Sequence, residues 1–374
     1  MQPNVRDPFA VQVGVRVKAA REAKKLTQEN LSNNLGFKDR QTLAAIEAGI
    51  RKVSAEELMR FMDVLERDLD FFTDPFRLVA EGHFSFRAHG LGDNGLEAFE
   101  EKAGCWIAFW RDQGRRQGIA SNPLRPKLAL NENSTFEEAQ AAGEALWTNW
   151  NLGDVPAMRL IETAEKQLDL LVLHVDAPDG ISGAACQVSG ADSILINRND
   201  LEGRRNFDLA HEIFHVLTWD ALPPQRVDRL HPKSYKDKHT ERLADYFAGA
   251  LLMPRAVLDP LWQAKDAKGL DLATWLAATA GKLQVSEDAL VVRLAILGFL
   301  SEADRPKPKG LPPKGTANEA IPPLFSRRFM ERAGRAIERG DVSVKRLVSI
   351  LAIKGTGELK QLFAVHGLKV PFDM

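Results

Sequence analysis

The pentapeptide His211-Glu212-Ile213-Phe214-His215 has residue types and a spacing that can bind a metal ion and activate water. Apolar residues recur around it at helical spacing, which predicts an amphipathic helix; they are Leu209, Ile213, Val216 and Leu217. Histidines four residues apart lie one turn above each other, so both neutral rings can chelate one zinc ion. Glu212 can reach a water on the metal as a general base. The alternative is an ordinary amphipathic helix with two surface histidines.

A second helical segment, residues 241–254, offers a third ligand. Pro254 ends it, and its apolar stripe consists of Leu243, Phe247, Ala250 and Leu251. Glu241 and Asp245 share the opposite face. Glu241 can give a carboxylate oxygen to zinc, and Asp245 can accept the free N–H of a ligating histidine and fix its tautomer. Three protein ligands and one water describe a catalytic zinc site, not a closed structural one.

The longer runs around these residues read RRNFDLAHEIFH (204–215) and ERLADYFAGALLMP (241–254). Together they resemble the ImmA/IrrE family of metallo-endopeptidases, over about residues 140–300. The resemblance implies a gluzincin-like domain in which zinc is held by two histidines and a glutamate and a second glutamate is the base, here His211, His215, Glu241 and Glu212. It also implies cleavage of a DNA-bound repressor, which switches on a stress or mobile-element programme. Phe214 replaces the small residue usual in the family, which would narrow the cleft.

The composition fits a protein of the cytoplasm. The 374 residues are 44% hydrophobic, enough for two or three domains with cores of their own. A formal net charge of −1 gives no global field directed at nucleic acid or acidic lipid. Cys105 and Cys186 are too few for a disulfide framework and suit a reducing compartment. No apolar run reaches the length of a membrane span, and no signal-peptide core follows Met1, so we expect no membrane partner.

Residues 8–75 have the pattern of a small all-helical domain. Two of its short helices are joined by the tight turn Gly36-Phe37-Lys38, which predicts a helix-turn-helix. The second helix would enter the major groove of double-stranded DNA with its first residues at the bases. Gln28, at the start of the preceding helix, is a candidate phosphate or base contact, and the candidate base readers are Arg40, Gln41 and Thr42.

The charge of this region is divided along the chain. Residues 1–52 hold ten Lys and Arg against five Asp and Glu, whereas residues 53–75 hold two against seven. A basic front and an acidic back are expected of a module that faces DNA. The alternative is a small helical domain that binds protein or forms dimers.

The runs LTQENL (26–31) and LAAIEAG (43–49) resemble the XRE/Cro-type helix-turn-helix family. The resemblance covers about residues 11–73. Glu47 and Gly49 match the glutamate and glycine that usually follow the recognition helix in that family. The resemblance implies that this domain binds an operator.

The stretch before the zinc helix predicts helices first and then a small antiparallel or mixed sheet. Residues 76–95 lose periodicity and are expected to form an ordered linker; the expected helices cover residues 96–118, 134–153 and 156–166. The expected strands cover residues 170–175, 181–188 and 193–197. We place a free sheet edge, where an extended substrate could add by main-chain hydrogen bonds, on Ile194–Ile196.

Several lone residues have a functional and a plain interpretation. Cys186 could cap the zinc as an off-switch, but a packed core cysteine is the simpler interpretation. His231 and Tyr235, in the polar loop of residues 218–238, could stabilise an oxyanion, or could be solvated loop residues. His174 is interpreted as a packed strand residue.

The remainder of the chain is expected to be helical. Two helices follow at residues 271–282 and 286–294, then a basic, proline-rich linker, and the last helices lie at 325–339, 343–351 and 357–366. The fold class is thus α+β and mostly helical. The domains are a helix-turn-helix at 8–75, a helical linker region at 76–140, a gluzincin-like zinc metallopeptidase at 141–303 and a helical tail at 317–374.

These features together predict a DNA-associated zinc metallo-endopeptidase that cleaves a transcriptional repressor or partner protein in a stress, prophage or mobile-element response. The expected partners are double-stranded DNA, a repressor or antitoxin-type protein substrate and, as one option, a second copy of the chain. The alternative is a helix-turn-helix regulator or antitoxin that does not cleave and uses the zinc domain as a sensor or partner clamp. Glu212 favours hydrolysis, because binding alone does not require a base.

Overall fold

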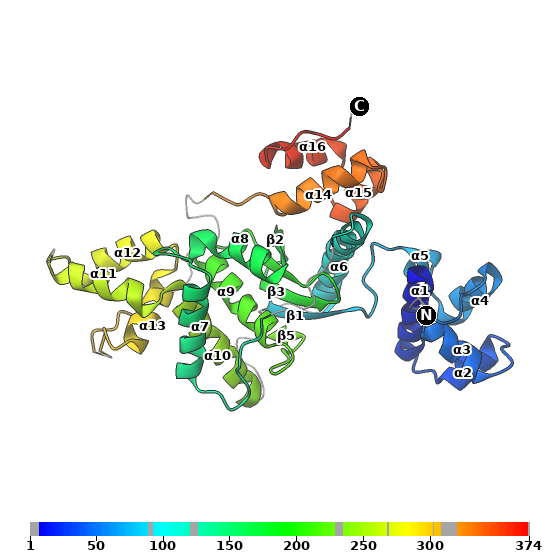
Figure 1. The fold of residues 1–374 in the computed structure, drawn as a ribbon, viewed down its shortest axis with the longest axis horizontal. Helices are drawn as coiled ribbons and strands as arrows, with labels where there is room; N and C mark the ends of the chain where they lie inside the picture. The colour runs from blue at the N-terminus through cyan, green and yellow to red at the C-terminus, as the bar shows by residue number, and fades with distance from the viewer. Residues whose placement is uncertain are drawn as a thin grey trace.

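The computed structural model describes residues 7–88, 93–119, 126–228, 235–267, 269–301, 303–307 and 320–372. Helices dominate these residues, and the strands form one five-stranded mixed sheet (Figure 1). The expected α+β fold class, mostly helical, is confirmed. None of the described helices combines the length and hydropathy needed to span a lipid bilayer. The domain boundaries stay predictions.

Residues 8–73 form five short helices: α1 Pro8–Ala23, α2 Gln28–Asn34, α3 Arg40–Glu47, α4 Ala55–Leu65 and α5 Leu69–Thr73. The Thr27 side chain accepts from Asn30 N at 3.1 Å and begins α2, as expected of an N-cap. Gly36, at φ +72°, turns the chain toward α3. The apolar faces share one core, which includes Val13, Val17, Leu31, Leu43, Ile46 and Phe61.

A buried ion pair ties α1 to α3. Arg21 donates to both carboxylate oxygens of Glu47, at 2.6 and 3.1 Å, and Gln28 donates to the same carboxylate at 2.8 Å. Arg21 and Glu47 side chains are only 10% and 4% exposed. Removal of one partner from such a pair leaves an uncompensated buried charge.

We therefore expect Glu47→Ala to destabilise the helix-turn-helix by about 3–5 kcal/mol. Hydrogen exchange measured on the whole chain should show lost amide protection in residues 8–73. Glu56→Gln is the matched control, because Glu56 pairs with Arg60 on the surface, with side chains 77% and 49% exposed. A surface pair contributes about 0–1 kcal/mol. Equal protection in both variants would contradict this expectation.

The sheet has the order β2-β4-β3-β1-β5. Its strands are β1 Gly82–Ala88, β2 Leu171–Val175, β3 Ile181–Val188, β4 Ser193–Asn197 and β5 Val227–Asp228. The β1–β3 and β3–β4 pairs are antiparallel, whereas β2–β4 and β1–β5 are parallel. The three strands expected from the apolar runs are therefore all present. The sheet was expected to be antiparallel or mixed, and it is mixed.

Two expectations about this sheet are wrong. The segment interpreted as a linker contains β1, which pairs with β3 along its whole length, from Gly82 opposite Val188 to Ala88 opposite Ile181. The free edge placed on Ile194–Ile196 is also wrong, because β4 lies between β2 and β3 and is wholly buried. The described strands at the edges are β2 and β5.

One face of the sheet is covered by the helices that carry the candidate site. These are α9 Glu202–Thr218 and α10 Tyr235–Leu252, with α7 Phe136–Asn149 and α8 Ala157–Leu168 beside them. Gly143 on α7 permits close contact with α10, since a Cβ there would lie 2.6 Å from Phe247 O. Leu209, Ile213, Phe214 and Phe247 are buried between these helices.

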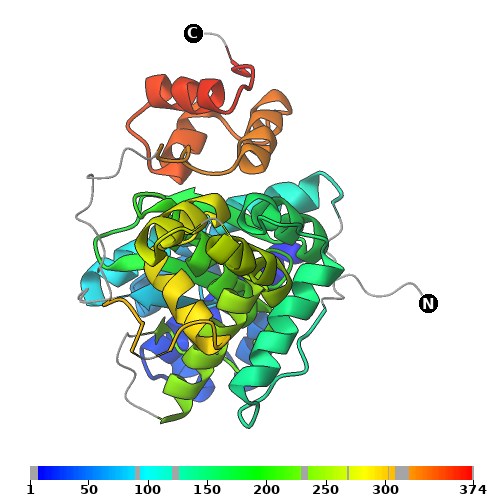
Figure 2. The same ribbon diagram turned by 90° about the vertical axis from the view of Figure 1, so that its left-hand side faces the viewer.

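Three more helices extend this core: α11 Arg255–Ala267, α12 Leu272–Leu283 and α13 Glu287–Ile296. The last two have nearly the expected bounds, and α11, which contains Pro260, lies in the stretch after Pro254 that was expected to be helical but was given no bounds. In Figure 2 these helices face the viewer, and the C-terminal helices form a separate layer above them.

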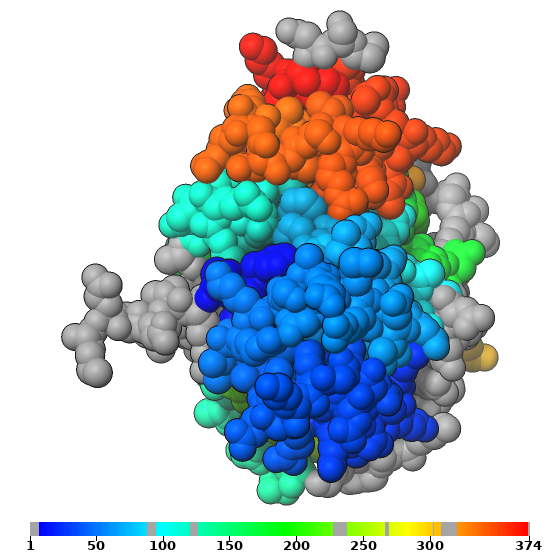
Figure 3. All heavy atoms as spheres, turned by 90° about the vertical axis from the view of Figure 1, so that its right-hand side faces the viewer, coloured from blue at the N-terminus to red at the C-terminus, as the bar shows by residue number. Residues whose placement is uncertain are grey.

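The opposite face of the sheet is covered by α6 Asp93–Arg116 and the C-terminal helices α14 Arg327–Glu338, α15 Val344–Leu351 and α16 Thr356–Val365. Aromatic rings join the two parts: Phe325 lies 5.2 Å from Trp106, and Phe329 lies 5.7 Å from Phe109. Arg346 on α15 forms an ion pair with Asp74, which directly follows α5. The tail, expected only as helices, therefore packs on the body of the protein beside the helix-turn-helix (Figure 3).

Candidate metal centre

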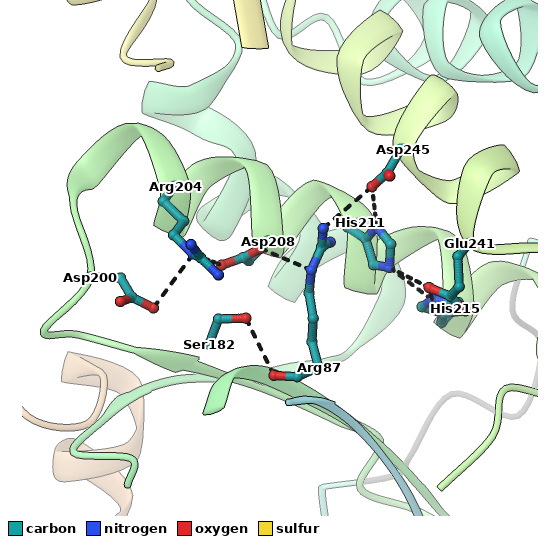
Figure 4. A network of polar contacts seen from close by, with 9 residues as sticks. All are labelled: Arg87, Ser182, Asp200, Arg204, Asp208, His211, His215, Glu241 and Asp245. Carbon is teal, nitrogen blue, oxygen red and sulfur yellow. Dashed lines mark hydrogen bonds and ion pairs between the residues drawn. The ribbon is translucent and has the colours of Figure 1, made fainter. Parts of the chain in front are cut away.

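Three acceptor atoms from α9 and α10 converge at the middle of α9. His211 Nε2 lies 3.1 Å from His215 Nε2 and 3.1 Å from Glu241 Oε2, and His215 Nε2 lies 3.5 Å from the same oxygen (Figure 4). Both rings are 1% exposed, and Glu241 is 17% exposed. The structure thus brings the three residues expected as ligands into one cluster. Among the described residues, this cluster has the spacing needed for its side chains to hold one metal ion together.

The donor set fits a tetrahedral zinc ion. Nitrogen and oxygen ligands about 2.0–2.2 Å from zinc lie about 3.3 Å from one another. The observed separations of 3.1–3.5 Å agree with that value. A neutral His211 ring that donates from Nδ1 has only a lone pair at Nε2, and this lone pair faces a carboxylate oxygen. Such a contact is repulsive unless a proton or a metal ion lies between the two atoms.

The His211 ring is expected to carry a second proton when no metal ion is bound. Burial and the nearby Arg87 lower the pKa of the His211 ring, but the hydrogen bonds to Asp245 and Glu241 outweigh them and raise it to about 10. Burial raises the pKa of Glu241, yet the two histidine rings reverse this and hold it well below its usual range. A divalent cation at the same place would replace that proton, since ligating imidazoles are neutral.

Asp245 lies where the spacing placed it, one turn after Glu241 on α10. Its Oδ1 is 3.0 Å from His211 Nδ1. Burial raises the pKa of the Asp245 carboxyl, but His211 and Arg87 outweigh it and the net shift is downward. An ionised Asp245 accepts a hydrogen bond from the Nδ1–H of His211 and so leaves the Nε2 of His211 available for a metal.

Glu212 is buried at the site without belonging to the donor cluster. It is 2% exposed, and its Oε2 has no hydrogen-bond partner in the described part of the chain. Burial raises the pKa of its carboxyl, whereas the histidine rings and Arg87 oppose the shift. Gly183 on β3 lies next to it, since a Cβ there would be in ordinary van der Waals contact with Glu212 Cγ, at 3.8 Å. A buried carboxylate with an unused oxygen and a raised pKa can accept and return a proton.

Sequence reasoning missed Arg87, which enters the site from β1. Its Nη2 lies 3.4 Å from Asp245 Oδ1, and its Nε lies 3.4 Å from Asp208 Oδ1 (Figure 4). Asp208 also lies 3.6 Å from Arg204, one turn away on α9. The i, i+4 spacing of Arg204 and Asp208 could have revealed their pair. Arg87 carries no such signal, because it lies more than 100 residues before α9.

The structure places Phe214 and Cys186 in the core, and it does not describe the side chains of the two loop candidates. Phe214 is fully buried against Phe247, with ring centroids 5.6 Å apart, so it fills the core between α9 and α10 and does not narrow a cleft. Cys186 is buried among the residues between the sheet and α6, and burial raises the pKa of its thiol. His231 lies outside the described residues, as does the side chain of Tyr235.

His174 lies on β2 and is partly buried, as expected of a packed strand residue. Burial and the nearby Arg205 and Arg198 lower its pKa to about 4. The ring is therefore neutral at physiological pH. The donor cluster of α9 and α10 does not include it.

The candidate DNA contacts lie on the helix-turn-helix as follows. Arg40 and Gln41 are exposed in the first turn of α3. Thr42 is partly buried, and its hydroxyl donates to Asp39, the N-cap of α3, at 3.1 Å. Gln28 is partly buried and donates to Glu47. Arg40 and Gln41 are thus available to DNA, whereas Thr42 and Gln28 also hold the fold together.

Comparison with known proteins agrees with both parts of the chain. Residues 165–295 match the IrrE N-terminal-like domain of the M78 peptidases, and residues 17–72 match a helix-turn-helix domain. The chain therefore combines a metallopeptidase-family domain with an XRE-type helix-turn-helix, a class of DNA-binding domain. Both suspected resemblances are confirmed.

Other comparisons add little. A structure described as the apo form of the competence regulator ComR from Streptococcus vestibularis aligns with 12% identity over 96% of this chain and 100% of that chain. Its TM-score is 0.17, which carries no argument about the fold. No curated protein matches the sequence.

Proposed function

We propose that this chain is a zinc metallo-endopeptidase that acts at DNA and cleaves a transcriptional repressor or partner protein in a stress, prophage or mobile-element response. One observation carries the proposal: two buried histidine nitrogens and the oxygen of the partly buried Glu241 converge beside a buried carboxylate that is not one of them. A site that only binds zinc needs the first feature, whereas hydrolysis needs both.

Each residue then has one role. His211, His215 and Glu241 would hold zinc, which when bound supplies Lewis-acid polarisation of a peptide carbonyl. Glu212 would accept the proton of the attacking water and pass it to the leaving amine. Asp245 would keep His211 in the tautomer with a free Nε2.

A cavity of about 540 Å³ adjoins the C-terminal end of α9, and its lining does not include His211, Glu212, His215 or Glu241. Val216 and Thr218, just after His215, form part of its wall, and His83 from β1 forms another part.

The test is cleavage of a candidate substrate. The purified, zinc-loaded chain is incubated with the protein encoded by an adjacent gene, and the products are identified by mass spectrometry. We expect one or a few defined fragments, and none after zinc is removed by a chelator. A partner that binds tightly and stays intact would favour the regulator that does not cleave.

We also propose that Arg40 and Gln41 read bases, because they are exposed at the start of the second helix of the motif. An operator can be selected from random DNA with the whole chain. Arg40→Ala should then weaken binding by about 1–3 kcal/mol and relax the preference at one base position. Arg60→Ala, on α4, is the control and should change affinity uniformly across sequences or not at all. An unchanged base preference in Arg40→Ala would remove it as a reader.

A further inference from the structure

We propose that Arg87 is a positioning residue of the metal centre, acting through Asp245 on the orientation of His211. The inference rests on the proposed function, since it takes His211 to be a metal ligand. Arg87 lies on β1, far earlier in the chain than α9 and α10. Neither the HExxH segment nor the sequence of α10 indicates that this strand contributes to the site.

A series of contacts connects Arg87 on the sheet, through Asp245, to the expected ligand His211. Arg87 Nη2 and His211 Nδ1 both approach the same oxygen, Asp245 Oδ1, at 3.4 and 3.0 Å. The His211 ring then presents its opposite nitrogen to Glu241 and His215. Figure 4 shows this chain of contacts from Arg87 to His215.

Asp245 needs a second partner to stay in place. Its side chain is half-buried, at 45% exposed, and burial alone does not hold its carboxylate in one rotamer. The His211 ring alone fixes only one contact. A second donor on the same oxygen, delivered by a rigid strand, reduces the freedom of the carboxylate and therefore that of the ring.

Arg87 is itself firmly held. Its side chain is 15% exposed, and its Nε faces Asp208, which is 3% exposed and lies one turn before His211 on α9. Ser182 on β3 donates to its backbone carbonyl at 3.3 Å. The guanidinium thus joins α9, which carries both histidines, to α10, which carries Glu241.

The chain offers a matched control. Arg204 also faces Asp208, at 3.6 Å, and its guanidinium lies 3.9 Å from Asp200, which precedes α9. Arg87→Met and Arg204→Met therefore both remove one cation from Asp208, and only the first removes a cation from Asp245. A general packing role predicts similar effects of the two variants, whereas a positioning role separates them.

The experiment measures zinc affinity by competition with a chromophoric chelator, together with the visible spectrum of the cobalt-substituted protein. Arg87→Met should weaken zinc binding about tenfold and alter the cobalt spectrum. Arg204→Met should stay within about twofold of the parent chain. Arg87→Lys keeps the positive charge but replaces the planar guanidinium, with its several N–H donors, by a single ammonium group. Its zinc affinity should therefore lie between those of the parent chain and Arg87→Met.

A double-mutant cycle tests the route through Asp245. In the Asp245→Asn background, Arg87→Met should add less than about twofold to the loss of zinc affinity. Three results would each overturn the inference: unchanged zinc binding in Arg87→Met, an equal loss in Arg204→Met, or additive losses in the double variant. A parent chain that binds no zinc would instead overturn the proposed function and this inference with it.

Discussion

Glu212→Gln should abolish peptide cleavage while the protein still binds zinc. Glutamine has nearly the same size and shape as glutamate, but it cannot accept a proton from water. General-base catalysis contributes roughly 10²- to 10⁴-fold, so we expect the cleavage rate to fall by about 10³-fold. Zinc affinity should change little, because Glu212 lies outside the cluster of three donor atoms. The rate is measured on the substrate repressor, and zinc by competition with a chelator.

Glu202→Gln is the control for this experiment. Glu202 begins the same helix, ten residues before Glu212, and lies far from the donor atoms. It should leave both cleavage and zinc affinity unchanged. Persistent cleavage by Glu212→Gln would assign the base to another residue, whereas loss of zinc would show that Glu212 helps to hold the metal.

Glu241→Gln should remove the third ligand and with it most of the zinc affinity. A neutral amide oxygen is a much poorer zinc ligand than a carboxylate. The change also removes the anion that faces both histidine rings, at 3.1 and 3.5 Å. We expect zinc affinity to fall by more than about 100-fold, the upper end of the loss usual for residues that only orient a ligand.

Asp245→Asn gives the comparison, because it keeps all three donor atoms and loses only the charge behind His211. It should weaken zinc binding by about 10- to 100-fold. Glu241→Gln should thus be the more damaging of two neighbouring carboxylate changes on α10. The reverse order, or full zinc affinity in Glu241→Gln, would place the third ligand elsewhere.

The parts of the site that lie close together in the chain could be predicted from the sequence. His211 and His215 are one turn apart on a strongly amphipathic helix, so their common direction follows from helix geometry alone. Glu241 and Asp245 repeat the same spacing on α10, and the first approaches His211 Nε2 while the second approaches His211 Nδ1. The two strands β3 and β4 could be bounded because turns at Gly180 and Gly190 separate apolar runs.

The parts that depend on long-range pairing could not be predicted. In β1, polar His83, Ser85 and Arg87 alternate with Phe84 and Phe86, but a five-residue alternation beside glycines also fits a packed loop. Its partner β3 lies about 100 residues later, and nothing local specifies that pairing. The parallel β2–β4 pair places β4 inside the sheet. It could not be predicted either, because nothing local in the sequence specifies that β2 pairs with β4. Arg87 could therefore not be connected to Asp245 before the sheet was known.

One zinc ion should bind between His211, His215 and Glu241. Anomalous diffraction from crystals of the zinc-loaded chain, recorded on both sides of the zinc absorption edge, tests it most directly. We expect one strong peak about 2.0–2.2 Å from the two Nε2 atoms and the Glu241 carboxylate. A peak held by other residues, or no peak in crystals of a protein shown to contain zinc, would contradict it.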